Sequence, residues 1–220
     1  MTRHFQREID RLKRNMLSLS ALVEESVHMA VRSILERDEQ LANQVVERDS
    51  EIDQVEVEVE EDCLKIMALH QPVAIDLRFL IAVLKINNDL ERIGDLAVNI
   101  AERCISLAKL PMKEIVFDVQ AMADIAKSML RRSLDALVNL DVRLAKDVGA
   151  DDNKIDAMHR DTYTVIKKAI LDDPSQVDQL IHMLAVSRHL ERIADHATNI
   201  AEDVIYMING EIVRHRVPEP

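Results

Sequence analysis

The architecture of the chain follows from one segment, Leu90-Glu91-Arg92-Ile93-Gly94-Asp95-Leu96-Ala97-Val98-Asn99-Ile100-Ala101-Glu102. This segment recurs 100 positions later as Leu190-Glu191-Arg192-Ile193-Ala194-Asp195-His196-Ala197-Thr198-Asn199-Ile200-Ala201-Glu202. The two copies differ only at positions 94, 96 and 98 of the first. Gene duplication is the simplest explanation, and it predicts that both halves of the chain share one fold and one kind of site.

Each copy has the spacing of an amphipathic helix. Apolar residues at alternating steps of three and four form a stripe in the first copy, namely Val83, Ile86, Leu90, Ile93, Ala97, Ile100, Cys104 and Leu107. The second copy repeats it with Val186, Leu190, Ile193, Ala197, Ile200, Val204 and Met207. At about 100° per residue, Glu91, Asp95 and Asn99 fall on the other side of the helix. The carboxylates are therefore expected outside the core.

Composition indicates an all-helical protein. Aromatic residues make up 2% of the chain and there are only 3 glycines, whereas Leu, Ile, Val, Ala, Met, Glu and Arg dominate. The net charge of −12 gives no general attraction to nucleic acid. No apolar run approaches the roughly 20 residues that span a bilayer, and the charged start of the chain does not look like a signal peptide. We expect a cytoplasmic protein that reaches a membrane only through its partners.

Turn signals divide the chain into six long helices. In the first half the first helix is expected at about 2–37 and the second from a cap at Asp38 to about Leu69. A turn at Gln71-Pro72 leads to the third, at about 74–109. In the second half the fourth helix is expected at about 118–140. The fifth runs from Asp141 to a turn at Asp173-Pro174, with a kink near Gly149, and the sixth from about Ser175 to Asn209. The chain is thus all-α, a tandem repeat of two three-helix bundles with domains at 1–111 and 112–220.

A second acidic motif faces the first. Asp49-x-x-x-Asp53 lies on the second helix and Asp152-x-x-x-Asp156 on the fifth. If the second and third helices fold back about Pro72, residues equally distant from the turn lie level, which puts Asp53 opposite Glu91 and Asp49 opposite Asp95. The same rule about Asp173-Pro174 puts Asp156 opposite Glu191 and Asp152 opposite Asp195. Four carboxylates are therefore expected at one height in each repeat.

Converging carboxylates favour a site for hard cations. Like charges four residues apart destabilise a helix by roughly 0.2–0.5 kcal/mol unless a cation uses them. Carboxylates without thiolates suit ferric iron, manganese, magnesium or calcium better than structural zinc, and four of them can hold more than one ion. His159 takes the place of Glu56 in the second repeat, so the metals of the two sites can differ. The free cysteines Cys63 and Cys104 lie on apolar stripes and are expected in the core.

Other readings of the same residues stay open at this point. The acidic stripe can be a solvated helix face of a metal-free structural scaffold, and His159 can be an ordinary surface histidine. Arg92 and Arg192 lie beside the acidic stripes, where they can pair with the carboxylates or join a metal in binding an anion such as phosphate. A competing function is a carboxylate-bridged metal oxidoreductase of the ferritin-like type, which needs Glu-x-x-His motifs; only Glu25-x-x-His28 and, imperfectly, Asp156-x-x-His159 fit.

The motifs resemble those of a known family. The segments Gln71-Pro72-Val73-Ala74-x-Asp76-Leu77-Arg78 and Lys85-Ile86-x-x-Asp89-Leu90-Glu91-Arg92-Ile93-Gly94-Asp95-x-Ala97-x-Asn99-Ile100-Ala101 are similar to those of the bacterial PhoU family of phosphate-specific transport accessory and regulatory proteins. The resemblance covers the whole chain. The second repeat departs from it with Asp173-Pro174-Ser175-Gln176 and with Ala194 in place of Gly94.

The resemblance implies a regulator rather than an enzyme. Family members couple the phosphate ABC transporter to a sensor histidine kinase and repress the phosphate-starvation response when phosphate is plentiful. Partners implied for this chain are therefore that kinase and the transporter ATPase, and its helical surface also suits a homodimer. The resemblance further implies multinuclear metal clusters, of iron foremost, with zinc, manganese, magnesium or calcium as alternatives. Carried over, the ligands are Asp49, Asp53, Glu91 and Asp95, and in the second repeat Asp152, Asp156, Glu191 and Asp195.

Overall fold

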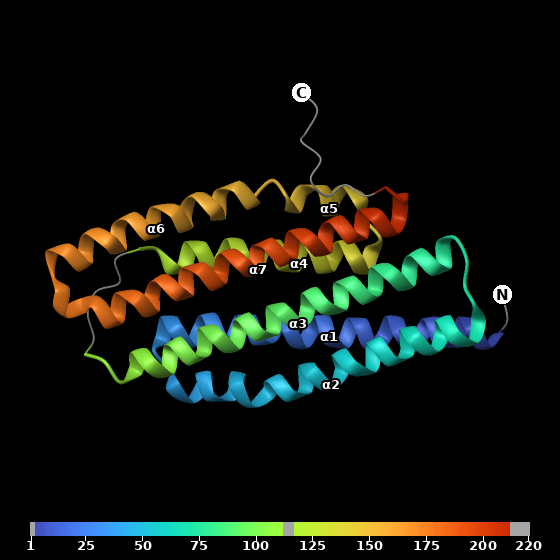
Figure 1. Cartoon of the computed structure of the whole chain (residues 1–220), viewed down its shortest axis with the longest axis horizontal. Coiled ribbons are helices and arrows are strands. Elements are labelled where there is room, and N and C mark those ends of the chain that lie inside the picture. Colours follow the sequence, from blue (N-terminus) through green and yellow to red (C-terminus); the bar gives the residue numbers. More distant parts are fainter. Residues whose placement is uncertain (1–2, 112–116, 212–220) are drawn as a thin grey trace, which may run out of the picture.

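The computed structural model describes residues 3–111 and 117–211, and within them the chain forms helices and no strands (Figure 1). The first half consists of α1 (Arg3–Glu36), α2 (Glu39–His70) and α3 (Ile75–Ala108). The second consists of α4 (Val119–Asn139), α5 (Val142–Val148), α6 (Asp152–Asp172), the 3₁₀ turn η1 (Pro174–Gln176) and α7 (Val177–Asn209). The expected all-α tandem repeat is confirmed. The expected helix start at Thr2 lies outside the described residues, as does the start of the second domain at 112.

Aspartates begin four of these elements. Each accepts a hydrogen bond from a backbone N–H of the first turn: Asp38 from Leu41 at 3.0 Å, Asp118 from Ala121 at 2.9 Å, Asp141 from Arg143 at 2.8 Å, and Asp173 from Ser175 at 3.1 Å. These contacts satisfy N–H groups that a helix start otherwise leaves unpaired. The helix starts expected at Asp38 and Asp141 are thereby confirmed, and so is the turn at Asp173-Pro174.

The fifth of the six expected helices is interrupted. α5 ends at Val148 and α6 begins at Asp152, so the kink expected near Gly149 is a complete break. Arg132 of α4 holds the two pieces, because its guanidinium donates to the backbone oxygen of Asp147 at 3.0 Å and pairs with Asp151. The break leaves α6 free to follow α7 at a different angle from that of α5.

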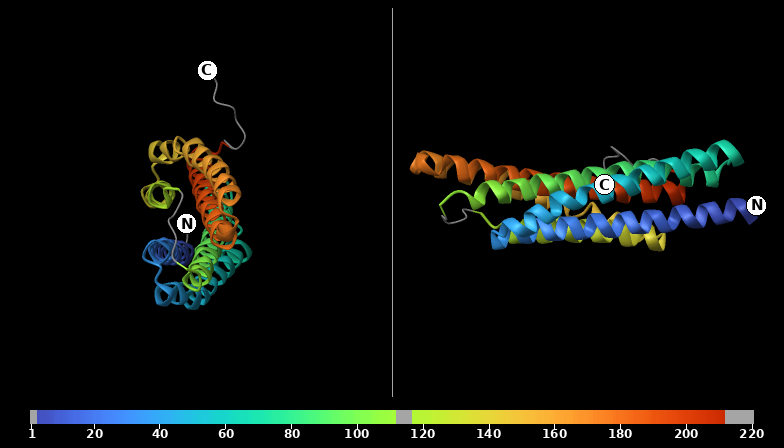
Figure 2. Two further views of the ribbon diagram at one scale, coloured as in Figure 1. Left: turned by 90° about the vertical axis from the view of Figure 1, so that its left-hand side faces the viewer. Right: turned by 90° about the horizontal axis from the view of Figure 1, so that it is seen from below.

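The helices that carry the duplicated segment form the centre of the molecule. α3 and α7 lie side by side and antiparallel, with α1 and α2 packed on α3 and with α4, α5 and α6 packed on α7 (Figures 1 and 2). Every residue of the two expected apolar stripes is buried, and Leu90, Ile93, Leu190 and Ile193 are completely so. Burial of this seam from both sides joins the two repeats through one hydrophobic core.

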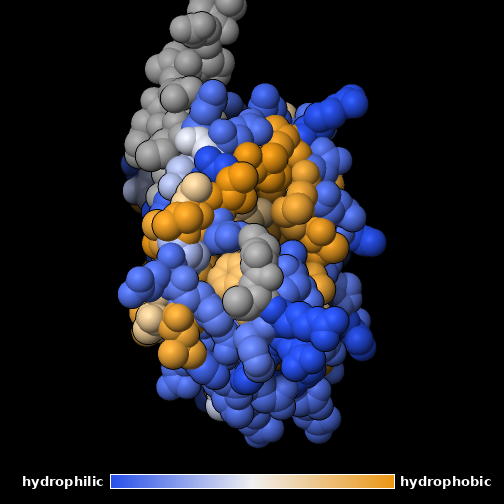
Figure 3. Space-filling view, turned by 90° about the vertical axis from the view of Figure 1, so that its right-hand side faces the viewer, coloured by the Kyte–Doolittle hydropathy of each residue, from blue (hydrophilic) through white to orange (hydrophobic). Residues whose placement is uncertain are grey.

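One end of the molecule has an apolar surface. Side chains at the end where α4 and α7 finish form a patch, while the surface below it is polar (Figure 3). Leu17, Val138 and Leu140 are 44%, 53% and 54% exposed, and with Phe79 and Met207 they line a groove of about 130 Å³. These apolar groups are scattered over four helices, and no described helix is both long and apolar enough to cross a membrane.

Candidate metal centres

The first acidic cluster lies between α2 and α3. Burial raises the pKa of Asp49 to about 6, and the neighbouring charges of Asp53, Asp95 and Glu91 act in the same direction. The charges of Asp53, Glu91 and Asp95 therefore all act on Asp49, as expected from their places on either side of the turn, but no three carboxylate oxygens of these described residues lie within 4.8 Å of one another. The four carboxylates are half-buried or exposed, as expected for groups outside the apolar stripe.

A glycine brings the two helices of this cluster close together. A Cβ atom on Gly94 would lie 3.3 Å from two carbons of Ile52 and 3.8 Å from Oδ1 of Asp49. Such contacts with a carbon are tighter than ordinary packing, so the absence of a side chain at position 94 favours the observed approach of α3 to α2. In the second repeat Ala194 occupies the corresponding place and is fully buried.

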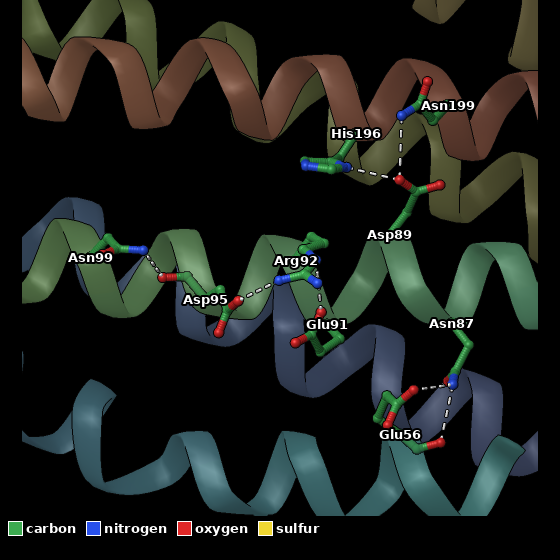
Figure 4. A network of polar contacts seen from close by, with 9 residues as sticks. All are labelled: Glu56, Asn87, Asp89, Glu91, Arg92, Asp95, Asn99, His196 and Asn199. Carbon is green, nitrogen blue, oxygen red and sulfur yellow. Dashed lines mark hydrogen bonds and ion pairs between the residues drawn. The ribbon is translucent and has the colours of Figure 1, made fainter. Parts of the chain in front are cut away.

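Arg92 partly neutralises the first cluster. Its Nε lies 3.3 Å from Oε2 of Glu91, and its Nη1 donates to Oδ2 of Asp95 at 3.3 Å (Figure 4). Asn99 donates to the backbone oxygen of Asp95 at 2.7 Å one turn further on. The arginine is half exposed, so these are screened ion pairs of modest strength. The pairing expected between Arg92 and the carboxylates is present.

The second acidic cluster is tighter. Asp156 of α6 and Glu191 and Asp195 of α7 each offer a carboxylate oxygen, and these oxygens lie within 4.8 Å of one another. Glu191 is only 8% exposed, which makes the expectation that all the carboxylates lie outside the core wrong for this residue. α6 packs on α7 with Asp156 beside Glu191, a contact that the helical stripe of α7 alone does not reveal.

The contacts of Glu191 leave one oxygen unused. Its Oε1 accepts from Nη1 of Arg188 at 2.6 Å, whereas its Oε2 is buried and has no hydrogen-bond partner. Burial raises the pKa of Asp195 to about 6, with Glu191, Asp152 and Asp156 adding to the shift. Asp152 is not one of the three close carboxylates, and it accepts from Oγ1 of Thr198 at 3.2 Å. The structure thus gathers all four expected residues, three of them closely.

The donor chemistry of both clusters suits a cation bound by oxygen, but only the second brings three carboxylate oxygens within 4.8 Å of one another in the described part of the chain. Half-buried carboxylates with raised pKa values have an excess of negative charge that a cation would balance. The unpaired Oε2 of Glu191 is a ready ligand, and the donor set is that preferred by hard cations. Asp49, Asp53, Glu91 and Asp95 would hold metal in the first repeat; Asp152, Asp156, Glu191 and Asp195 would do so in the second.

The residues of the ferritin-like alternative do not form one centre. Glu25 accepts from Nη2 of Arg48 at 2.9 Å, and His28 lines a groove that α1 forms with α4. Asp156 instead faces α7 in the other half of the fold. A di-metal core needs its motifs on helices that face one another, so this alternative is not supported.

Comparison with known proteins places the chain in a family. The family model described as "PhoU domain" matches residues 16–104 and 119–204, one match in each repeat. The chain belongs to the PhoU family. The membership indicated by the sequence motifs is confirmed, and the matches correspond to the α1–α3 and α4–α7 halves of the fold.

Relatives of similar length carry names from phosphate transport. A protein from Pseudomonas putida is 37% identical over 216 residues, covering 98% of this chain and 84% of the relative. One from Aquifex aeolicus is 37% identical over 210 residues, covering 96% and 95%. Both are named phosphate-specific transport system accessory protein PhoU homolog. The crystal structure of PhoU from Pseudomonas aeruginosa has a TM-score of 0.92 at 35% identity, covering 94% of this chain and 100% of that one.

Polar contacts between the repeats were not expected from the sequence. His196 and Asn199 of α7 reach Oδ1 of Asp89 on α3, at 2.8 and 3.3 Å (Figure 4). Lys85 donates to Oδ1 of Asp203 at 3.3 Å further along the same seam. One signal pointed here: position 196 is among the three at which the duplicated segments differ, with His196 in place of Leu96.

Proposed function

We propose that this protein is a cytoplasmic negative regulator of the phosphate-starvation response. It acts without catalysis, by contact with the ATPase of the phosphate ABC transporter and with a sensor histidine kinase. The observation that carries the proposal is the match of both repeats to the PhoU domain, over a fold that covers the whole of a PhoU crystal structure. The names of the relatives supply the link to phosphate transport.

Metal clusters are the second part of the proposal. The two sets of carboxylates hold multinuclear clusters, with iron as the first candidate and zinc, manganese, magnesium or calcium as the others. Support comes from the close oxygens of Asp156, Glu191 and Asp195 and from the unpaired Oε2 of Glu191. Bound metal would balance the acidic charge between α2 and α3 and between α6 and α7, and so stiffen the outer helices that a partner meets.

Reconstitution with purified partners tests the regulatory role. The chain is immobilised, and the transporter ATPase and the cytoplasmic part of the sensor kinase from the same organism are passed over it at low and high phosphate. We expect retention of at least one of them, and a change in retention with phosphate. Failure to retain either protein at both phosphate concentrations would overturn the proposal. Light scattering of the chain alone reports whether it forms the homodimer that its helical surface suits.

A further inference from the structure

One end of the molecule brings the start of α1 beside the turn between α2 and α3 (Figure 1). The rings of Phe5 and His70 lie 5.2 Å apart, and Nε2 of His70 lies 2.5 Å from Oε2 of Glu8. The other carboxylate oxygen of Glu8 lies 3.8 Å from Nζ of Lys65. These contacts hold the first turns of α1 against the last turns of α2, so exposed residues of both elements share this end.

Large apolar side chains protrude from the α2–α3 turn. Val73 is 74% exposed, Ile75 69% and Leu69 64%. Ala74 has a φ of 50° and a ψ of −113°, a backbone conformation that residues with a Cβ atom rarely adopt. Strained turns persist mainly where they serve binding or catalysis, and apolar side chains gathered at such a turn indicate a binding surface.

The face of α1 that lies away from the core is basic next to this turn. Four exposed arginines fall within about 80° of the helix circumference at about 100° per residue, namely Arg3, Arg7, Arg11 and Arg14. Of the four, only Arg11 has an ion pair with another described residue, Asp62 at 3.2 Å. Residues 3–14 hold five Arg and Lys against two acids, a charge of +3 in a chain of net charge −12. This positive charge is not neutralised by the described part of the protein.

The corresponding turn of the second repeat has different chemistry. It lies at the opposite end of the molecule, between α6 and α7 (Figure 1). Leu171 is 73% exposed there, but the next residues are acidic or polar and include Asp172, Asp173 and Asp178. Of the two turns, the first therefore combines several protruding apolar side chains with neighbouring bases.

We propose that the α2–α3 turn and the basic face of α1 bind the surface of a membrane that contains anionic lipid. Leu69, Val73 and Ile75 enter the boundary between headgroups and acyl chains, and the arginines of α1 meet the lipid phosphates. Apolar side chains flanked by bases suit this interface, where burial of apolar groups and attraction to anionic headgroups act together. A protruding turn can enter a fluid surface, whereas a protein partner would need a cavity of matching shape.

This contact is the chain's own, in addition to the contact through partners that the sequence suggested. Vesicle binding by the purified full chain tests it. The chain is mixed with vesicles of phosphatidylglycerol and phosphatidylcholine in equal parts, or of phosphatidylcholine alone, and bound protein is separated by flotation. We expect binding to the mixed vesicles that weakens as salt rises, and much weaker binding to the neutral ones.

Two double variants remove the two parts of the surface. Val73→Ser with Ile75→Ser removes apolar side chains from the turn, and Arg3→Gln with Arg7→Gln removes bases from α1. We expect each pair of changes to weaken binding to the mixed vesicles by about tenfold or more. The four residues are exposed, so the fold should be kept, and thermal unfolding of each variant checks this.

Matched controls come from the rest of the surface. Leu171→Ser with Ile181→Ser removes two exposed apolar side chains, and Lys167→Gln with Lys168→Gln removes two exposed bases from α6. The changes in apolar surface and in net charge are then the same as in the test variants. Both controls should bind the mixed vesicles as wild type does.

Three results would overturn the inference. Wild type that does not bind the mixed vesicles at low salt excludes it, and equal losses in test and control variants show a general effect of charge or composition. If the turn variant binds vesicles normally but loses the transporter ATPase, the kinase or self-association, a protein occupies the surface. The vesicle experiment uses the chain alone, so its failure leaves the proposed function standing, and failure of the reconstitution leaves this inference standing.

Discussion

Nδ1 of His159 lies 2.8 Å from the hydroxyl of Ser187. In the first repeat the corresponding residues are Glu56 and Asn87, and Asn87 donates to Oε1 of Glu56 at 2.9 Å (Figure 4). Both contacts tie an outer helix to a central one, a single turn from the acidic clusters. His159 is half-buried rather than the ordinary surface residue that was one of its two readings. The two repeats thus have a hydrogen bond at the same place, made by a carboxylate and an amide in the first and by an imidazole and a hydroxyl in the second.

This substitution predicts different metal preferences for the two repeats. Burial lowers the pKa of His159, so the imidazole is neutral at pH 7 and able to act as a nitrogen ligand. Imidazole suits zinc and iron better than magnesium or calcium. We expect zinc to compete more effectively for the second site than for the first, and His159→Glu to remove the difference. Competition with magnesium, followed by elemental analysis of single-site variants, measures it.

Removal of one carboxylate from each cluster should lower the metal content. Asp95→Asn and Asp195→Asn each delete a negative charge from a cluster while keeping its shape. Elemental analysis of the purified, untagged double variant should show loss of most of the iron, manganese or zinc bound by wild type. The matched control is Asp161→Asn, an exposed aspartate of α6 outside the clusters. Equal metal content in double variant and wild type would refute the assignment of these ligands.

Arg92 is expected to weaken metal binding in the first repeat. It pairs with Glu91 and Asp95, so a metal must displace it or share its partners. Arg92→Gln should therefore raise the affinity of the first site several-fold, measured by titration with manganese. Its counterpart Arg192 makes no ion pair within the described part of the chain, and Arg192→Gln should have a smaller effect. An unchanged affinity in Arg92→Gln would mean that the arginine does not compete.

The raised pKa values predict that acid stabilises the metal-free protein. In the folded state the pKa of Asp49 and of Asp195 is about 6, against an ordinary value of 3.8. The folded state therefore holds protons that the unfolded state releases, and this stabilisation is complete below pH 3.8 and is lost as pH rises through 6. With screening by solvent, we expect the two groups to contribute about 1 kcal/mol together.

Urea denaturation in chelator at pH 5 and pH 7 measures this difference. Wild type should be more stable at pH 5, and the double variant Asp49→Asn, Asp195→Asn should show a smaller dependence on pH. Addition of metal at pH 7 should restore stability to wild type and not to the variant. A wild-type stability that increases from pH 5 to pH 7 in chelator would contradict the electrostatic argument.

The contact between Asp89 and His196 is expected to stabilise the junction of the repeats. Asp89 is 9% exposed, and its carboxylate has His196 and Asn199 as hydrogen-bond partners. His196→Leu, which copies Leu96 of the first repeat, leaves a buried carboxylate with one weak partner and should cost about 1–3 kcal/mol. A double-mutant cycle with Asp89→Leu should give a coupling energy of at least 0.5 kcal/mol. Additive effects of the two changes would show that the contact contributes nothing.

Local chemistry made most of the fold predictable from the sequence. Pro72, Asp173-Pro174 and the aspartate caps mark the ends of helices by rules that involve only neighbouring residues. The apolar stripe of α3 follows from helical periodicity alone. The break before α6 was expected only as a kink. In the structure Arg132 of α4 binds both sides of the break, a contact between helices that local sequence rules do not reveal.

The convergence of the carboxylates was predictable because an antiparallel hairpin fixes which residues lie level. The burial of Glu191 was not, since it depends on how closely α6 covers α7. The contacts of the seam were also missed, because no rule of sequence spacing relates α3 to α7 across the two repeats. A difference between otherwise identical segments, such as Leu96 against His196, is the one local signal of such a contact.

The antiparallel seam has the symmetry of an interface between two copies of a half-length chain. In such a homodimer every substitution appears twice, so an acid placed on one half of the interface also appears on the other. Joining the halves in one polypeptide removes this constraint. Asp89 and Asp203 could then coexist with His189 and Arg103 at symmetric places, a combination closed to a symmetric dimer. Fusion thus allowed acids and bases to pair across one half of the seam while the other half changed its residues independently.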